Sequence, residues 1–147
     1  MSDNIATVRK GFAAFATGDM DTLREVFDPG IEWHLPGRST ISGDYRGVDA
    51  VLGLFGTIFQ ISGGTFKAEL IECGELTSDL VACLIHRSGA MPAGAVDQRT
   101  MLLFQLRDGR AVEVTEFAYD LYAYDEAVGP RAITLPDARK VDAPVTT

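Results

Sequence analysis

The sequence has little of what nucleic-acid and nucleotide sites require. Its 13 lysines and arginines are outnumbered by 21 aspartates and glutamates, for a net charge of −8, and the basic residues do not cluster. Binding to a phosphate backbone depends on clustered positive charge. The 15 glycines form neither the G-x-G-x-x-G nor the G-x-x-x-x-G-K-[ST] loop that holds nucleotide phosphates. We therefore expect no nucleic-acid partner and no nucleotide.

Metal-ligating and oxidisable residues are also scarce. The two histidines, His34 and His86, lie in different segments without the local ligand spacings of zinc sites, so no metal is expected. Cys73 and Cys83 form no C-x-x-C motif, which predicts free thiols in a reducing cytoplasm, with a disulfide between neighbouring strands left open. No apolar run approaches the ~20 residues that span a bilayer, and the N-terminus has no signal-peptide core. These absences predict a cytoplasmic protein that needs neither membrane nor cofactor.

The first half of the sequence has helical periodicity. Apolar residues recur every three or four positions over residues 4–17 and 48–61, which predicts a helix in each range. Gly18 is suited to end the first of these helices. Between the two we expect three further segments: a short helix capped by Asp19 or Asp21 and ended by Pro29-Gly30, a strand over 31–35, and a polar loop over 38–47.

The second half has the period of two that is typical of strands. The dipeptide Asp108-Gly109 favours a type I′ turn between two β-rich runs, which predicts a hairpin. Helices followed by a meander of strands indicate the α+β class. We expect one domain over 1–128 and a proline-containing tail over 129–147. The predicted strands span residues 65–73, 79–88, 96–107 and 110–121.

The second arm of this hairpin carries the first candidate for chemistry. Alternation places Glu116 on the same face as Val112 and Val114. A carboxylate between valines is either held in an apolar hollow, where it can act as a general acid or base, or paired with an arginine or a backbone N–H at the edge of the sheet. Phe117, Tyr119 and Tyr122 fall on the opposite face or beyond it, and an exposed apolar patch of this kind calls for a partner.

Four spaced motifs occur in one order along the chain: F-x-x-G-D-x-x-x-L (15–23), D-P-x-I-x-W-H-x-P-G (28–37), G-x-Y-x-G-x-x-A-V (43–51) and D-G-R-x-V-E-x-x-E-F (108–117). Over residues 4–125 the chain resembles the SnoaL-like branch of the nuclear-transport-factor-2-like superfamily. That group includes ketosteroid isomerase, scytalone dehydratase, limonene epoxide hydrolase and the SnoaL-type polyketide cyclases. The resemblance implies a cystatin-like roll, in which a cone-shaped, strongly curved, mostly antiparallel sheet carries three N-terminal helices. It also implies an interior pocket and a homodimer formed through the convex sheet face.

The resemblance assigns roles to particular residues. His34 stands where ketosteroid isomerases carry their carboxylate base. Phe12 and Phe15 stand where those enzymes have a tyrosine that holds the enolate oxygen, so steroid isomerase activity is not implied. Asp97 and Arg99, with Glu116 on the adjacent strand, are similar to the Asp-Arg-Asp set of limonene epoxide hydrolase.

The expected function is cofactor-independent acid–base chemistry on a hydrophobic, oxygen-bearing small molecule, of the isomerase, cyclase or dehydratase type. His34 would take a proton alpha to a carbonyl, and Glu116 would orient His34 across the cavity or return the proton. The alternatives are a non-catalytic ligand-binding or dimerisation module and an epoxide hydrolase.

Residues expected to bind the substrate are Phe12, Phe15, Tyr45, Phe55, Phe59, His86, Arg99, Leu102, Phe104, Val114 and Asp120. Several of them also have an ordinary structural interpretation. His86 would be a core or pocket-wall histidine, Asp120 a salt-bridged or capping carboxylate and Tyr45 a loop anchor, and for Arg99 and Asp97 the ordinary explanation is a cross-strand ion pair.

Overall fold

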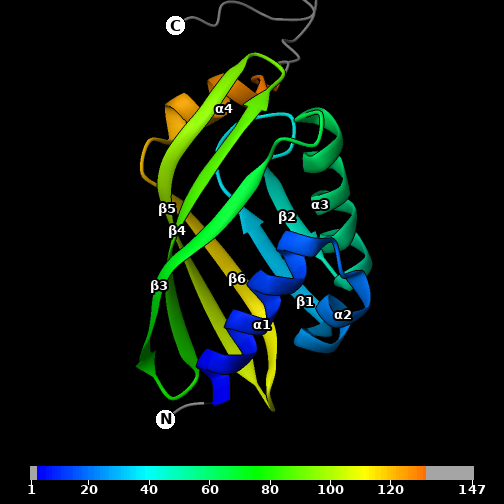
Figure 1. Ribbon diagram of the computed structural model, residues 1–147, viewed down its shortest axis with the longest axis vertical. Helices are drawn as coiled ribbons and strands as arrows, with labels where there is room; N and C mark the ends of the chain where they lie inside the picture. Colours follow the sequence, from blue (N-terminus) through cyan, green and yellow to red (C-terminus); the bar gives the residue numbers. More distant parts are fainter. Residues whose placement is uncertain (1–2, 132–147) are drawn as a thin grey trace, which may run out of the picture.

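The computed structural model describes residues 3–131 and has α+β architecture, as expected. Its six-stranded sheet has the order β2-β1-β6-β5-β4-β3. The sheet curves strongly, and α1 lies across one end of it while α3 runs along β1 and β2 (Figure 1). In chain order the elements are α1 (Asp3–Thr17), α2 (Met20–Val26), β1 (Phe27–Leu35), β2 (Gly43–Arg46), α3 (Val48–Ile61), β3 (Lys67–Thr77), β4 (Leu80–Met91), β5 (Gly94–Arg107), β6 (Arg110–Ala118) and α4 (Leu121–Val128).

Local signals in the sequence place most of these elements correctly. The third helix occupies residues 48–61 as predicted. Asp19 caps α2, since its side chain accepts a hydrogen bond from the backbone N–H of Thr22 at 3.1 Å. Asp108 and Gly109 both have positive φ, at 53° and 77°, as a type I′ turn requires. Caps, turns and helical periodicity are therefore reliable in this chain.

The first strand and its partners differ from the expectation. β1 begins at Phe27 rather than residue 31, and a bulge takes up Asp28, Pro29 and Gly30, where the register with β6 shifts. β1 pairs in parallel with β6, and β2 (Gly43–Arg46), in the range predicted as a loop, pairs with its other edge. Proline has no backbone N–H, and it is accepted at position 29 because a residue in a bulge need not donate a hydrogen bond to the neighbouring strand. The sheet is therefore mixed, although most of its pairings are antiparallel.

The end of the described chain also differs. The strand expected to reach residue 121 stops at Ala118, and α4 (Leu121–Val128) follows, capped by Asp120, which accepts from Ala123 N–H at 3.0 Å. Residues 129–131, predicted as the start of a tail, pair with residues 38–42. The rest of the predicted tail, 132–147, lies outside the described residues. Among the helices of residues 3–131, none is both long and apolar enough to cross a bilayer.

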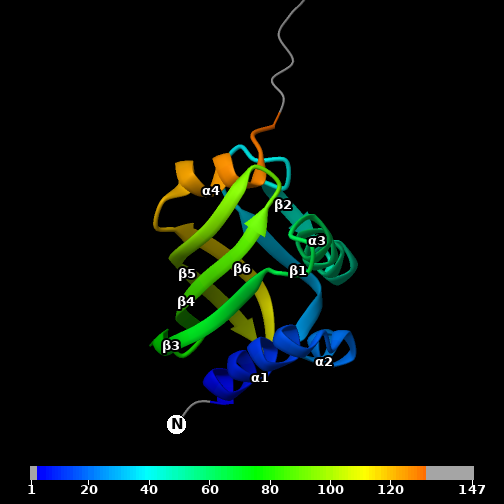
Figure 2. The same cartoon turned by 45° about the horizontal axis from the view of Figure 1, so that its top comes forward.

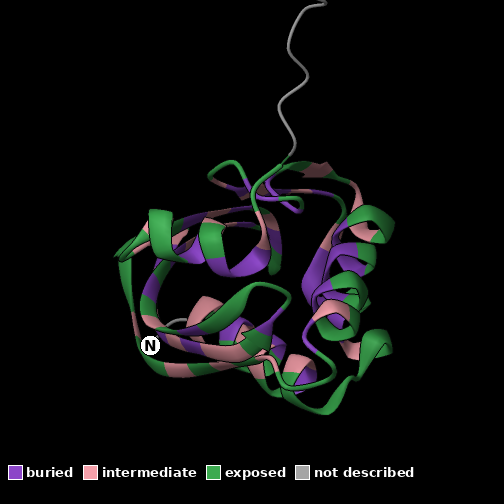
Figure 3. Cartoon of the chain, turned by 90° about the horizontal axis from the view of Figure 1, so that it is seen from above, coloured by how far each residue is buried: buried purple, intermediate pink, exposed green. Residues whose placement is uncertain are grey.

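The core lies inside the curve of the sheet, between the strands and the helices. Figure 2 shows the helices around this space, and Figure 3 shows buried residues, in purple, in both the helices and the strands. On β4 the alternation of buried and half-buried residues runs from Leu80 to Ser88, so one face of that strand is interior. Packed against the interior face are aromatic rings in edge-to-face contacts: Phe12, Phe15, Phe27, Trp33, Phe55 and Phe104.

The cap of α2 gives a direct test of the fold. Replacing Asp19 by Ala removes the acceptor for an orphan N–H of the helix, and we expect a loss of about 1 kcal/mol in the free energy of unfolding. Asp21→Ala, in the same helical turn, is the control and should change it by less than about 0.5 kcal/mol. Urea denaturation measures both. Equal effects from the two changes would contradict the capping role.

Candidate active site

The hairpin β5–β6 points Glu116 into the cone. Val114 and Glu116 are buried on the interior face of β6, whereas Glu113 and Phe117 are exposed. The predicted alternation fails at Val112, because a bulge next to Leu106 makes Ala111 the buried neighbour of Val114. The interior position expected for Glu116 is therefore confirmed.

The carboxylate of Glu116 is held by two donors. Trp33 donates its indole Nε1–H to Oε2 at 2.6 Å, and Arg87 donates from Nη1 to Oε1 at 2.5 Å. The exposed fractions of Glu116 and Arg87 are 6% and 4%. A charged pair this deeply buried is stable only when both groups are paired and hydrogen-bonded. Glu116 therefore has the arginine partner that was one of the two structural interpretations, but in the interior rather than at the edge of the sheet.

Arg87 is the site residue that sequence reasoning missed. It follows Val81, Cys83 and Ile85 at period two on the interior face of β4, so its signal was a charged residue in an otherwise apolar alternation. Its guanidinium carbon lies 4.1 Å from the ring centroid of Tyr124 on α4. Burial raises the pKa of Tyr124 to about 12, so the phenol beside this cation is neutral at ordinary pH.

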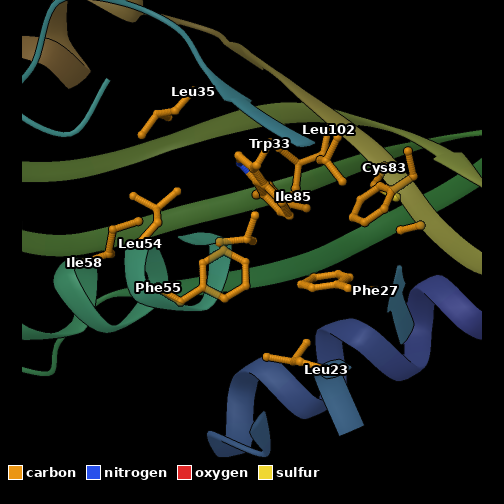
Figure 4. Packing of buried hydrophobic residues seen from close by; sticks show 14 of the residues in the cluster. Leu23, Phe27, Trp33, Leu35, Leu54, Phe55, Ile58, Cys83, Ile85 and Leu102 are labelled. Atoms are coloured by element: carbon orange, nitrogen blue, oxygen red, sulfur yellow. The ribbon is translucent and has the colours of Figure 1, made fainter. Parts of the chain in front are cut away.

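The Arg87–Glu116 pair lies in the wall of an apolar cavity that contains about 60 Å³ of free space. This space suffices for a few water molecules but not for an aromatic ring. Figure 4 shows Phe27, Trp33 and Phe55 filling the region between the strands and the helices. Of the residues expected to bind substrate, five line the cavity: Phe12, Phe15, Phe55, Leu102 and Phe104.

A larger groove of about 660 Å³ lies next to this cavity, between the end of α1, α3 and the start of β3. Phe15, Phe55 and Phe66 line both spaces, and their rings meet edge to face, with centroids 5.0 Å apart for Phe15 and Phe55 and 6.3 Å for Phe15 and Phe66. These rings separate the groove from the cavity. Phe59, expected to bind substrate, lines the groove and is 64% exposed.

The structure does not form the predicted pair of His34 and Glu116. Neighbouring strand residues point to opposite faces, and Trp33 takes the interior position, so His34 lies on the outer face of the sheet. Its Nδ1 hydrogen-bonds Asp44 and its Nε2 hydrogen-bonds Glu113, both at 2.7 Å. The proposal that His34 takes a proton inside the cavity is therefore wrong in its geometry.

His34 belongs instead to an acidic cluster outside the cone. The hydrogen bond to Asp44 raises the pKa of His34, partial burial opposes the shift, and Glu113 adds to it. Glu32, His34 and Glu113 offer ligand atoms within 4.8 Å of one another, a grouping of possible metal ligands that no local spacing in the sequence predicts. In the described residues both ring nitrogens are already engaged by carboxylates.

His86, Asp97 and Arg99 also lie on the outer face. His86 Nε2 hydrogen-bonds Asp97 at 2.5 Å, which raises the pKa of His86, and Arg99 is opposite His86 in the register of β4 and β5. Because Glu116 points inward, the set of Asp97, Arg99 and Glu116 expected for an epoxide hydrolase does not converge. His86 and Arg99 are likewise not in the cavity wall, which corrects both predictions.

Three further residues predicted to bind substrate stabilise the fold instead and do not line the cavity. Tyr45 donates its hydroxyl to the carbonyl of Ile41 at 2.6 Å, as a loop anchor does, and Asp120 caps α4. Val114 is fully buried but does not line the cavity. Cys73 and Cys83 are opposite one another on β3 and β4 as free thiols, and burial raises the pKa of Cys83 to about 12.

The outer face of β5 and β6 and the adjoining α4 expose large apolar side chains. The exposed fractions are 54% for Phe117, 85% for Tyr119 and 89% for Tyr122, and Met101 lies beside Phe117 in the register. The exposure expected for these aromatic residues is thus observed. The homodimer that would cover them stays a prediction.

Comparison with known proteins agrees with this architecture. A family described as the SnoaL-like domain matches residues 8–114, and the chain belongs to it. An uncharacterized protein of Mycobacterium tuberculosis is 36% identical over 114 residues, which cover 77% of this chain and 86% of that protein.

Two solved structures have the same fold. Bal32a, from a soil-derived mobile gene cassette, is 38% identical with a TM-score of 0.82, covering 86% of this chain and 97% of its own. A protein of unknown function with a cystatin-like fold from Xanthomonas campestris is 30% identical with a TM-score of 0.81, covering 88% and 99%. The resemblance seen in the sequence motifs is therefore confirmed for family and fold.

The buried ion pair predicts non-additive effects on stability. Arg87→Met or Glu116→Leu leaves one buried charge without its partner, and each should lower the free energy of unfolding by about 3–5 kcal/mol. The double variant should lose clearly less than the sum. Arg9→Met, which breaks an exposed ion pair with Glu72, is the control and should cost at most about 1 kcal/mol. Additive losses in urea denaturation would contradict a coupled buried pair.

The cluster around His34 predicts a pH-dependent contribution to stability. The folded-state pKa of His34 is raised, so its contribution is fully present below an unfolded pKa of about 6.5 and is lost as the pH rises through the folded value. We expect His34→Gln to lower the free energy of unfolding more at pH 6 than at pH 9. His86 titrates in both proteins, so its effect cancels in the difference. A difference independent of pH would contradict the prediction.

Proposed function

We propose that this protein is a cofactor-independent proton-transfer enzyme that acts on an apolar carbonyl compound, with Glu116 as its base. The observation that supports this most strongly is the carboxylate of Glu116, buried in the wall of an apolar cavity beside Arg87 and Trp33. Each carboxylate oxygen can accept two hydrogen bonds, so each retains one acceptor position beside its present donor. A C–H group adjacent to a carbonyl can deliver its proton to that position.

The proposed reaction begins with enolate formation. The C–H bond breaks, its proton joins a carboxylate oxygen of Glu116, and the electron pair moves onto the carbonyl oxygen. Return of the proton from Glu116 to another carbon gives isomerisation. Attack of the enolate carbon on a second carbonyl, whose oxygen takes the proton from Glu116, gives cyclisation. Departure of a β-hydroxyl, which takes that proton and leaves as water, gives dehydration. These three outcomes share one first step. The cavity supports that step without determining the outcome.

Access to Glu116 requires motion of the aromatic rings. About 60 Å³ of free space does not admit the body of a carbonyl substrate, whereas the adjoining groove of about 660 Å³ does. Phe15 and Phe66 lie at the boundary and are only partly buried, so they can turn without breaking the sheet. We propose that the substrate enters between α1 and β3 and displaces these rings.

Deuterium exchange into a simple ketone tests the base. Acetophenone incubated with the protein in D₂O should lose its methyl proton signal by ¹H NMR faster than in buffer. In Glu116→Gln the protein-dependent rate should fall by roughly 10²–10⁴-fold, the contribution of one positioned base. Glu113→Gln, on the same strand but on the outer face, is the matched control and should keep the rate. Circular dichroism confirms that each variant is folded.

A non-catalytic ligand-binding module is the second candidate. It is favoured by the engagement of both Glu116 oxygens, each of which already accepts a hydrogen bond. Binding of acetophenone without exchange above buffer would support this module and contradict the enzyme. A rate that is equal in wild type and Glu116→Gln would show that Glu116 is not the base.

A further inference from the structure

We propose that the free edge of the Arg87 guanidinium binds the carbonyl oxygen of a neutral ligand, and that this group, rather than a tyrosine, holds the enolate oxygen. This inference rests on the proposed function for the place of the ligand beside Glu116 and for the formation of the enolate, whereas binding of the carbonyl oxygen requires only the ligand. The inference goes beyond the proposed function in two respects: it names Arg87 as a binding residue, and it restricts the substrate to uncharged carbonyl compounds.

The guanidinium of Arg87 has more donors than the folded chain uses. Nη1 donates to Glu116, while Nε and Nη2 have no hydrogen-bond partner among residues 3–131. The side chain is 4% exposed and lines the cavity. Buried donors without partners are costly, so native structures rarely keep them without a functional reason.

The stack on Tyr124 fixes the plane of the guanidinium. With its carbon 4.1 Å from the ring centroid, the group cannot tilt freely to bring its unused N–H bonds to another acceptor. The ion pair to Glu116 fixes the rotation within that plane. The unused donors therefore have a set direction before a ligand arrives, which is the condition for an effective oxyanion site.

A second unpaired group lies on the same face. Thr100 is 1% exposed, and its Oγ1 has no hydrogen-bond partner within the described chain. In the register of the sheet it stands opposite Ile85 on β4 and Ala118 on β6, so it occupies the strand that the Arg87 side chain crosses to reach Glu116. Thr100 does not line the cavity, so it adds a second unpaired polar group beside the ion pair but no contact with the ligand.

Charge favours a neutral ligand over an anion. Arg87 and Glu116 together carry no net charge, and an incoming carboxylate would add an unpaired negative charge beside Glu116 in an apolar space. A ketone adds none. When Glu116 takes the proton, its negative charge disappears as the carbonyl oxygen gains one, and the guanidinium then pairs with the enolate. The number of charges in the cavity is the same before and after the step.

The Nε–H signal of Arg87 in ¹⁵N-labelled wild-type protein tests this binding. Acetophenone, α-methylstyrene and benzoate have nearly the same shape, with a carbonyl, a CH₂ and a carboxylate at the same place. We expect acetophenone to shift the Arg87 Nε–H resonance and to bind at least about tenfold more tightly than α-methylstyrene, as a hydrogen bond to a charged group provides. Benzoate should bind more weakly than acetophenone.

Two variants localise the effect. Arg87→Lys keeps the charge but loses the planar fork, and it should reduce the advantage of acetophenone over α-methylstyrene to less than about threefold. Arg99→Lys, on the outer face of β5, is the control and should keep that advantage. If Arg87→Lys does not fold, the wild-type resonance and the three affinities still decide the question.

The outcomes separate this inference from the proposed function. An unchanged Nε–H resonance at saturating acetophenone, no detectable binding of acetophenone, equal affinities for the ketone and α-methylstyrene, or tighter binding of benzoate would each overturn the inference. A shifted resonance with no deuterium exchange would support the Arg87 site and contradict the enzyme. Exchange that depends on Glu116 but not on Arg87 would support the base alone.

Discussion

The interior of this protein is organised by one ion pair, between Arg87 and Glu116. Two charges with exposed fractions of 4% and 6% are held inside an otherwise apolar cone, and Trp33 contributes the third hydrogen-bonding group. Removing charges from water is expensive, and their attraction repays this only where geometry and additional hydrogen bonds are good. Leucine side chains could fill the same space without the free-energy cost of removing charges from water. The retention of a charged pair in the cavity wall is therefore the main physical reason to regard the cavity as functional.

The aromatic rings around the pair determine how it can be reached. Edge-to-face contacts link Phe15 to Phe55 and Phe55 to Trp33, so the rings form a continuous layer from the groove to the carboxylate. A filled interior of this kind strengthens every electrostatic interaction inside it by excluding water. It also means that ligand entry and core packing are the same physical process. Tighter packing of these rings stabilises the folded protein but hinders the entry of a ligand to Glu116.

The sequence predicts the elements of this fold far better than it predicts the site. Local signals suffice for the third helix, the Asp19 cap and the Asp108-Gly109 turn, because each depends on residues only a few positions apart. The motif resemblance supplied the family and fold, both of which are confirmed. Period-two alternation placed Glu116 on the same face as Val114, and the structure shows that this face is interior.

The errors at the site have separate causes. The alternation of Ile31, Trp33 and Leu35 with Glu32 and His34 places His34 on the outer face, whereas the resemblance to ketosteroid isomerases placed it in the cavity. The parallel pairing of β1 with β6 has no local signal, because it joins strands that are far apart in the chain. Arg87 was missed for a different reason. Its interior position follows from the alternation on β4, but a lone arginine among apolar residues was not taken as a site residue. His86 was expected in the pocket wall, but it alternates with the buried residues Ile85 and Arg87 on β4 and therefore lies on the outer face.

The parallel pairing of β1 with β6 affects how the protein folds during its synthesis. Trp33 and Glu116 are 83 residues apart in the chain, and their strands become neighbours only when β6 inserts beside β1. Contacts of such large separation slow folding, since loop-closure entropy must be overcome before they form. During synthesis, the indole of Trp33 emerges long before its acceptor exists. A nascent chain that ends before β6 would have an unclosed sheet, an exposed aromatic layer and an unpaired Arg87, so the cavity comes into existence only when the last strand is added.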